Sequence, residues 1–107
     1  MISFEDFKKL DIKIGKILSA EKIPDSEKLI KLVVDDGEGE RQLIAGIGEA
    51  YPDVEELVGK EIPILANLEP KKLMGEMSEG MILAADNEGL PVLIHPDKEI
   101  PPGSIVR

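Results

Sequence analysis

The residue types best suited to ligand chemistry gather in one short stretch, ANLEPKKLMGEMSEGM, at positions 66–81. It contains two adjacent lysines, Lys71 and Lys72, together with the amide of Asn67 and the hydroxyl of Ser78. Ammonium, amide and hydroxyl groups are those that contact the phosphate oxygens and 2′-hydroxyl groups of a folded RNA. The stretch therefore predicts a small polar site for a phosphate backbone. The alternative is an ordinary solvated loop, because runs of charge usually lie on exposed faces.

Catalytic chemistry finds little support in the sequence. Ser78, His95 and Asp97 are the residue types of a nucleophilic triad, but EMSEG around the serine lacks the first glycine of a nucleophile elbow. The GIG at 46–48 lacks the remaining residues of a phosphate-binding loop, so a tight turn is the better interpretation. We expect His95 to be a hydrogen-bonded histidine at the end of a strand, and the chain to carry no catalytic residue.

Ligand count excludes disulfides and cysteine–histidine zinc sites, and leaves only hard, oxygen-bound metals possible. The chain has no cysteine and one histidine, which rules out disulfides and any zinc site built from these two residue types. The acidic turn DDGEGE, residues 35–40, lacks the ligand spacing and the closing glutamate of a calcium loop. We therefore expect no metal and no cofactor.

Charge is segregated along the chain. The formal net charge is −9, a sign that repels nucleic acids at long range. Residues 8–31 nevertheless carry seven lysines against four acidic residues, whereas residues 35–61 carry nine acidic residues against Arg41 and Lys60. A fold could gather the lysines on one face. Indiscriminate binding to polyanions is disfavoured, whereas a confined basic patch is compatible with this pattern.

Aromatic residues are scarce, since the chain has only Phe4, Phe7 and Tyr51. Proteins that bind single-stranded nucleic acids stack successive bases on rows of aromatic side chains. This chain cannot offer such a row, so general single-strand binding is disfavoured. Recognition of a folded RNA by its shape, through a few lysines, amides and hydroxyls, remains open.

The length of 107 residues predicts a single domain, 1–107. No apolar run approaches the roughly 18 residues that suggest a membrane span, so no membrane association is expected. Glu5 and Asp6 stand where a secretory signal would carry positive charge. We expect a cytoplasmic protein.

Local signals predict two short helices. Ser3 and Asp6 form a loose capping box for a helix over residues 4–9, which we expect to dock Phe4, Phe7 and Leu10 on the core. A second helical turn is predicted over 51–59, because Pro52 suits its opening, Asp53, Glu55 and Glu56 suit its N-terminal end, and Gly59 can close it.

Alternating and branched apolar residues predict six short strands. They are expected at residues 11–20, 29–36, 41–46, 61–67, 81–86 and 90–96. The alternation changes phase at Gly15, which predicts a bulge or bend in the first strand. Pro63 predicts that the fourth strand runs along an edge or contains a bulge, because proline cannot donate to a ladder. Met81 is expected mainly in the core, with its edge reaching the binding face.

Short strands, a bent first strand and a helix after the third strand together describe a small closed barrel. The predicted fold class is all-β: a five-stranded oligonucleotide/oligosaccharide-binding (OB-fold) barrel. It would have a short N-terminal helix, a short inserted helix and a C-terminal strand extension. An SH3-like barrel and a two-layer sandwich are the structural alternatives.

Several motifs occur in an order and spacing that covers almost the whole chain. They are DIKIGKI, EKL after the turn at Pro24, GI at 46–47, LVGK, ANL-PKKLMG, S-GM-LAA and PPGS. With them the sequence resembles the tRNA-binding domain appended to methionyl-tRNA synthetases. That family also contains free-standing, structure-specific tRNA-binding proteins and the endothelial monocyte-activating polypeptide. One departure is Ile23, where many relatives have a histidine before the turn proline, so no role of that histidine is transferred.

The resemblance implies an OB-fold barrel that recognises the outer corner of tRNA by shape without reading the anticodon. It also implies a homodimer formed through the C-terminal segment, about residues 90–107. The RNA-binding candidates carried over to this chain are Lys28, Arg41, Asn67, Lys71, Lys72, Ser78 and Met81.

These inferences lead to one functional hypothesis and two rivals. The hypothesis is a non-catalytic tRNA-binding domain or subunit of methionyl-tRNA synthetase, which raises the tRNA affinity of a catalytic partner. The first rival is a peptide-binding chaperone, because a secretion-related chaperone resembles the same barrel family. The second rival is an assembly domain that recruits protein subunits without RNA.

Overall fold

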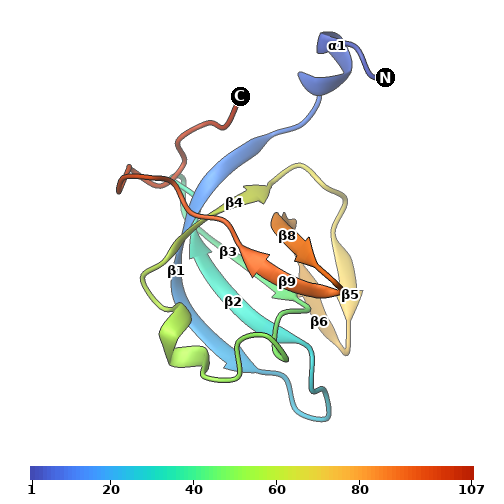
Figure 1. The fold of residues 1–107 in the computed structure, drawn as a ribbon, viewed down its shortest axis with the longest axis vertical. Helices are drawn as coiled ribbons and strands as arrows, with labels where there is room; N and C mark the ends of the chain where they lie inside the picture. Colours follow the sequence, from blue (N-terminus) through green and yellow to red (C-terminus); the bar gives the residue numbers. More distant parts are fainter.

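Five antiparallel strands form the main sheet of the computed structural model, which describes residues 1–107 (Figure 1). Their hydrogen-bonded order is β3-β2-β1-β4-β7. The bounds are β1 Ile12–Lys22, β2 Ile30–Asp35, β3 Glu40–Ala45, β4 Glu61–Leu65 and β7 Met81–Ile82. Two hairpins add β5 Lys71–Leu73 with β6 Glu76–Ser78, and β8 Ala84–Asn87 with β9 Leu90–Leu93. The helical elements are α1, Phe4–Phe7, and a 3₁₀ turn, η1, Val54–Leu57.

The long strand β1 serves two neighbours and thereby curls the sheet. Its first half pairs with β4 and its second half with β2, with a register shift between Ile17 and Ser19. The predicted bend is therefore confirmed, but the bulge lies beyond Gly15. Gly15 faces the interior, where an added Cβ would lie 3.4 Å from the side chains of both Ile64 and Val34.

Alternation along the strands fills the barrel. Ile30, Leu32 and Val34 of β2 are buried, whereas the residues between them are partly exposed. Fully buried side chains also come from the other strands and from η1: Ile17, Leu43, Leu57, Ile62 and Ile64. Each such side chain contributes roughly 1.5–3 kcal/mol relative to an exposed one. The core lies inside the sheet, with η1 packed against it through Leu57.

The free edge of β3 is closed by Ser78, the last residue of β6, and by Glu79, which follows it. The Ile44 N–H donates to the Ser78 hydroxyl over 3.0 Å, and the Glu79 N–H donates to the Gln42 carbonyl over 2.9 Å. Because β7 pairs with β4 at the opposite edge, the sheet closes into a nearly complete barrel. The OB-like barrel predicted from the sequence is confirmed, and the inserted helix is the 3₁₀ turn η1.

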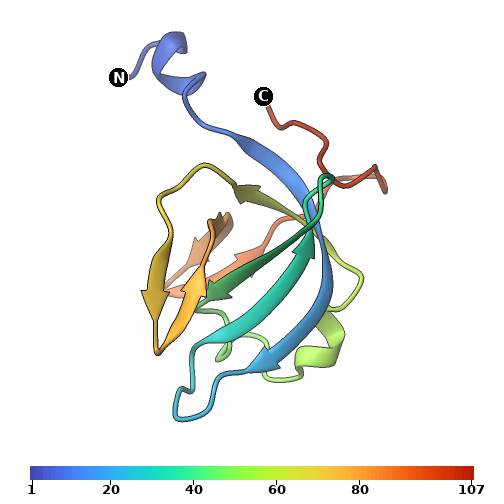
Figure 2. The same cartoon turned by 180° about the vertical axis from the view of Figure 1, so that it is seen from behind.

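The C-terminal extension returns to the first strand. After the β8–β9 hairpin the chain runs beside the first half of β1, as Figure 2 shows from behind. The Ile14 N–H donates to the Ser104 carbonyl over 2.9 Å, and the Val106 N–H donates to the Ile12 carbonyl over 2.8 Å. The last residues thus take the position of a further strand at this edge.

Two expectations about local packing are wrong. The helix α1 is capped by Ser3 and Asp6 as predicted, but it extends away from the barrel and buries none of its residues (Figures 1 and 2). Phe4 is 71% exposed and Leu10 is 45% exposed, so neither docks on the core. Pro63 does not mark an edge, since β4 lies between β1 and β7. It is tolerated because β7 pairs only with Ile64 and Leu65.

Neither helical element could span a bilayer, since α1 and η1 have four residues each.

Candidate nucleic-acid interface

The two adjacent lysines stand on the β5–β6 hairpin, not in an irregular loop. Lys71 pairs with Ser78 and Lys72 pairs with Met77. Both lysines are exposed, and neither takes part in an ion pair. Successive residues of a strand point to opposite faces, so Lys71 faces the barrel with Ser78 while Lys72 faces away with Met77. The two ammonium groups can therefore reach different phosphates.

An apolar groove lies beside Lys71. One hollow of about 220 Å³ is walled by Ile44, Leu68, Leu73 and Met81, with Lys71 at its rim. It shares Ile44 and Met81 with a second hollow of about 380 Å³, which continues over β3, β7 and the start of β8. Met81 is 45% exposed, so the expectation that it lies mainly in the core is wrong. Its thioether forms part of the groove surface next to the lysine.

Ser78, the last residue of β6, lies on the inner face of the β5–β6 hairpin. The residue is buried, and its hydroxyl accepts from the Ile44 N–H over 3.0 Å and donates to the Gly80 carbonyl over 3.0 Å. Gly80 itself has φ +137°, and an added Cβ there would lie 2.7 Å from the Leu65 carbonyl oxygen. The hydroxyl therefore joins the hairpin to the edge of β3.

Asn67 fixes the start of the same segment. Its side-chain oxygen accepts from the Asp11 N–H over 2.9 Å, and its amide nitrogen donates to the Lys9 carbonyl over 2.7 Å. The Ala66 N–H adds a bond of 2.8 Å to the Asp11 carbonyl. Asn67 thus connects the end of β4 to the residues that precede β1.

Arg41 lies at the base of the hairpin. Its Nη1 donates to the Ala66 carbonyl over 2.8 Å and to the Glu79 carbonyl over 2.6 Å. Its Nε donates to Asp36 Oδ2 over 3.0 Å. Burial alone would raise the pKa of Asp36, but hydrogen bonds from Glu38, Arg41 and Gly39, together with the charge of Arg41, lower it below its ordinary value.

Lys28 lies in the turn between β1 and β2. Its side chain is exposed, and its carbonyl accepts from the Gly48 N–H over 2.7 Å. Figures 1 and 2 place this turn at the same end of the barrel as the tip of the β5–β6 hairpin. Lys28, Lys71 and Lys72 are therefore the sequence-predicted cations with free ammonium groups, whereas Arg41, Asn67 and Ser78 are engaged in internal hydrogen bonds.

The family model described as "Putative tRNA binding domain" matches residues 12–105 of the chain. The chain belongs to this family. The resemblance drawn from the sequence motifs is thereby confirmed.

Several relatives of this tRNA-binding domain are longer proteins, which it matches over a part of their length. The methionine–tRNA ligase of Archaeoglobus fulgidus is 55% identical over 105 residues, which cover 98% of this chain and 16% of that protein. The corresponding enzyme of Thermotoga maritima is 50% identical over 105 residues, with the same two coverages of 98% and 16%. The chain thus spans about 16% of the length of these relatives.

Two solved structures share the tRNA-binding domain fold at nearly full length. The MetRS related protein from Pyrococcus horikoshii superposes with a TM-score of 0.94 at 41% identity, covering 100% of this chain and 98% of that chain. The chaperone CsaA from Bacillus anthracis superposes with a TM-score of 0.89 at 37% identity, covering 100% and 99%.

Two further side chains of the tRNA-binding domain, which the sequence did not single out, fix the β5–β6 hairpin to the barrel. Lys31 of β2 pairs with Glu21 over 2.9 Å and with Glu76 of the hairpin over 3.7 Å, which raises the pKa of Lys31. Gln42 donates to the Met77 carbonyl over 2.9 Å. These side chains hold the hairpin on the outer face of β2 and β3. Lys31 lies between the buried Ile30 and Leu32, which is a local signal that it points outward, but no local signal in the sequence gives the partners of Lys31 or Gln42.

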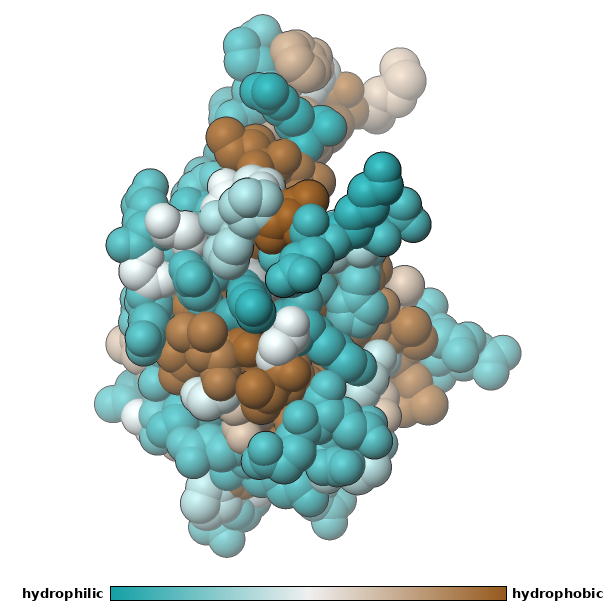
Figure 3. All heavy atoms as spheres, turned by 90° about the vertical axis from the view of Figure 1, so that its left-hand side faces the viewer, coloured by the Kyte–Doolittle hydropathy of each residue, from teal (hydrophilic) through white to brown (hydrophobic).

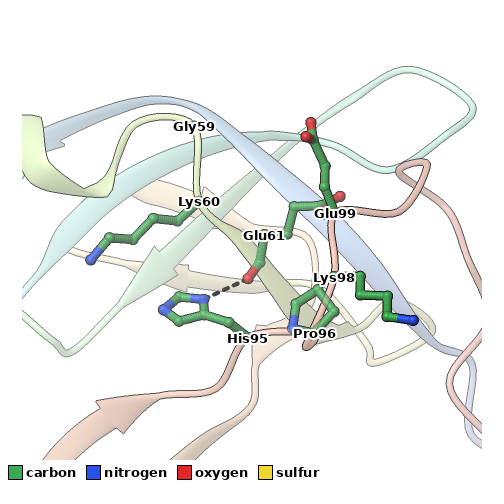
Figure 4. A pocket seen from close by; sticks show the side chains of 7 residues that line it. All are labelled: Gly59, Lys60, Glu61, His95, Pro96, Lys98 and Glu99. Atoms are coloured by element: carbon green, nitrogen blue, oxygen red, sulfur yellow. Dashed lines mark hydrogen bonds between the residues drawn. The ribbon is translucent and has the colours of Figure 1, made fainter.

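A polar hollow of about 480 Å³ lies between residues 59–61 and 95–99, on another part of the domain (Figure 4). Within it, His95 Nδ1 lies 2.7 Å from the Glu61 carbonyl and donates to it. The prediction of a hydrogen-bonded histidine just beyond a strand is confirmed. No hydrogen bond joins Ser78 to His95: the Ser78 hydroxyl bonds to Ile44 and Gly80, and His95 Nδ1 bonds to the Glu61 carbonyl.

Proposed function

We propose that this tRNA-binding domain is a non-catalytic, shape-specific tRNA-binding module that raises the tRNA affinity of the catalytic part of methionyl-tRNA synthetase. The observation that carries the proposal is the β5–β6 hairpin. It holds Lys71 and Lys72 exposed and unpaired on a rigid barrel, within a chain of a tRNA-binding family. The relatives that are methionine–tRNA ligases support the choice of partner.

The electrostatics favour confined contact over general attraction. The net charge of −9 repels a polyanion at a distance, so binding must depend on a few short-range contacts. Lys71 and Lys72 supply two of these, and Lys28 supplies a third from the turn between β1 and β2, a turn that lies at the same end of the barrel (Figure 1). Few phosphate contacts, fixed on a rigid frame, suit recognition of the outer corner of tRNA by shape and not by anticodon sequence.

A homodimer through the C-terminal segment, residues 90–107, belongs to the proposal. Apolar side chains of α1, of the residues after it and of the C-terminal segment lie exposed together, and Figure 3 shows apolar atoms gathered below α1. They line adjoining hollows of about 350 and 270 Å³ that share Ile105 and Val106. A second copy would cover this surface and would double the lysine patch, which offsets a modest single-site affinity. The setting is the cytoplasm, where aminoacylation takes place.

The test is a salt titration of tRNA binding. The slope of log affinity against log salt should correspond to only a few phosphates per protomer. The double variant Lys71→Ala/Lys72→Ala should flatten that slope by about two contacts and weaken binding. The matched control is Lys60→Ala/Lys98→Ala, which removes the same charge at the polar hollow of Figure 4. Equal losses in both double variants would show that net charge, not the hairpin, sets the affinity.

A chaperone function is the second candidate, favoured by the match to the CsaA structure and by the apolar groove at Met81. A groove of this kind could hold an extended apolar peptide segment. Competition distinguishes the two functions. If an unfolded apolar peptide displaces tRNA, the groove and the lysines form one shared site, and if the peptide does not bind at all, the chaperone candidate is removed.

A further inference from the structure

We propose that Arg41 is a positioning residue for tRNA binding. Its guanidinium ties both ends of segment 66–79 to the acidic turn between β2 and β3, and so determines where Lys71 and Lys72 stand. This inference rests on the proposed function, since the positions of the lysines matter only if the hairpin binds RNA.

One nitrogen joins the two ends of the segment. Nη1 of Arg41 donates to the carbonyl of Ala66, the first residue after β4, and to that of Glu79, the first residue after β6. An Arg NH₂ group carries two hydrogens and can therefore serve both acceptors. The whole β5–β6 hairpin lies between these two carbonyls, so its base cannot spread while both bonds are made.

Asp36 orients the guanidinium. Its Oδ2 accepts from Arg41 Nε over 3.0 Å, while its Oδ1 accepts from the N–H groups of Glu38 and Gly39 over 2.9 and 3.0 Å. Asp36 is 6% exposed, so the carboxylate is held in place by the turn itself. The planar fork of arginine fits such an arrangement, whereas a lysine offers a single flexible donor centre.

The same contacts argue against a role of Arg41 that consists mainly of direct contact with the RNA. The side chain of Arg41 is 21% exposed, and its charge is compensated by a buried carboxylate. Other side chains hold only part of the segment: Gln42 bonds the carbonyl of Met77, and Asn67 fixes the start. Arg41 is the side chain that bonds both ends.

Binding measurements can separate positioning from direct contact. Arg41→Lys and Arg41→Met are each made alone and together with Lys71→Ala/Lys72→Ala. We expect each single Arg41 variant to weaken tRNA binding by roughly tenfold. In the background that lacks both lysines, the same substitutions should change the affinity by less than about twofold, because the effects of two substitutions are not additive when one residue acts through the other. A direct contact between Arg41 and a phosphate predicts the opposite. Arg41→Lys would then keep most of the affinity, and the fold-losses of Arg41→Met and of Lys71→Ala/Lys72→Ala would multiply in the combined variant.

Hydrogen exchange of the RNA-free protein supplies a second readout. In Arg41→Lys, and to a smaller extent in Asp36→Asn, amides of residues 71–78 should exchange faster, while amides of β1 and β2 stay protected. Asp36→Asn keeps an acceptor for the Glu38 and Gly39 N–H groups, so it serves if the Arg41 variants do not fold. Unchanged hairpin exchange, with wild-type tRNA binding intact, overturns this inference alone. A wild-type protein that binds no tRNA overturns the proposed function, and this inference with it.

Discussion

The Gly48 N–H donates to the Lys28 carbonyl over 2.7 Å, which links the loop after β3 to the turn between β1 and β2. The approach is so close that a Cβ on Gly48 would lie 2.9 Å from that carbonyl oxygen and 2.7 Å from the Glu27 oxygen. The main chain of Lys28 is therefore held in position by a glycine that lies far from it in sequence.

We predict that Gly48→Ala destabilises the protein by about 1–3 kcal/mol, because the added methyl group must push two main-chain carbonyls aside. Chemical denaturation measures this change. Gly46→Ala is the matched control in the same loop, since its Cβ would meet nothing within 4 Å. The close approach has no energetic role if both variants unfold at the same denaturant concentration.

The barrel strands were predictable because their signal is local. Ile30, Leu32 and Val34 alternate along β2, and such a period specifies both the strand and its inward face. The bent first strand could be predicted for the same reason, although Gly15 marks an interior contact and not the bulge.

The β5–β6 hairpin could not be predicted from local pattern. Its strands have three residues each, and it is stabilised by contacts with β3 that are distant in sequence, such as Ser78 with Ile44. The partners of the polar residues around the hairpin could not be predicted from local pattern either. The sequence shows that Arg41, Asn67 and Ser78 can hydrogen-bond, but not that their partners are carbonyls and amides of the chain. The position of α1 was mispredicted for a related reason. Phe4 and Leu10 are apolar and were expected in the core, but whether another element covers them depends on the tertiary structure, and in the structure they are exposed.

Stability should depend on the charge of Asp36 in the acid range. The hydrogen bonds from Glu38, Arg41 and Gly39 outweigh burial and hold the folded-state pKa of Asp36 below its ordinary value of 3.8. A carboxyl with a lowered folded-state pKa stabilises the protein above its unfolded pKa, and this stability is lost as pH falls through the folded value. We predict that wild type loses more stability than Asp36→Asn between pH 5 and the acid limit, as measured by denaturation at each pH. Parallel pH profiles would contradict this assignment.

Ile105→Lys should abolish the proposed dimer. Ile105 is 67% exposed and lines both hollows of the apolar surface, where a buried ammonium without a partner is strongly unfavourable. Sedimentation should show a monomer, and tRNA affinity should fall by about tenfold or more because the two patches no longer act together. Val58→Lys is the control, since Val58 is 44% exposed after η1. A variant that stays dimeric would remove residues 90–107 from the interface.

Ser78→Ala tests whether the buried hydroxyl acts through the hairpin or on RNA directly. The substitution leaves the Ile44 N–H and the Gly80 carbonyl without their partner, which should cost about 1–3 kcal/mol of stability. Because the Ser78 hydroxyl holds the end of β6 on β3, tRNA affinity should fall together with stability. Ser19→Ala, at an exposed position of β1, should change neither. Weakened tRNA binding at unchanged stability would instead show that the hydroxyl reaches the RNA.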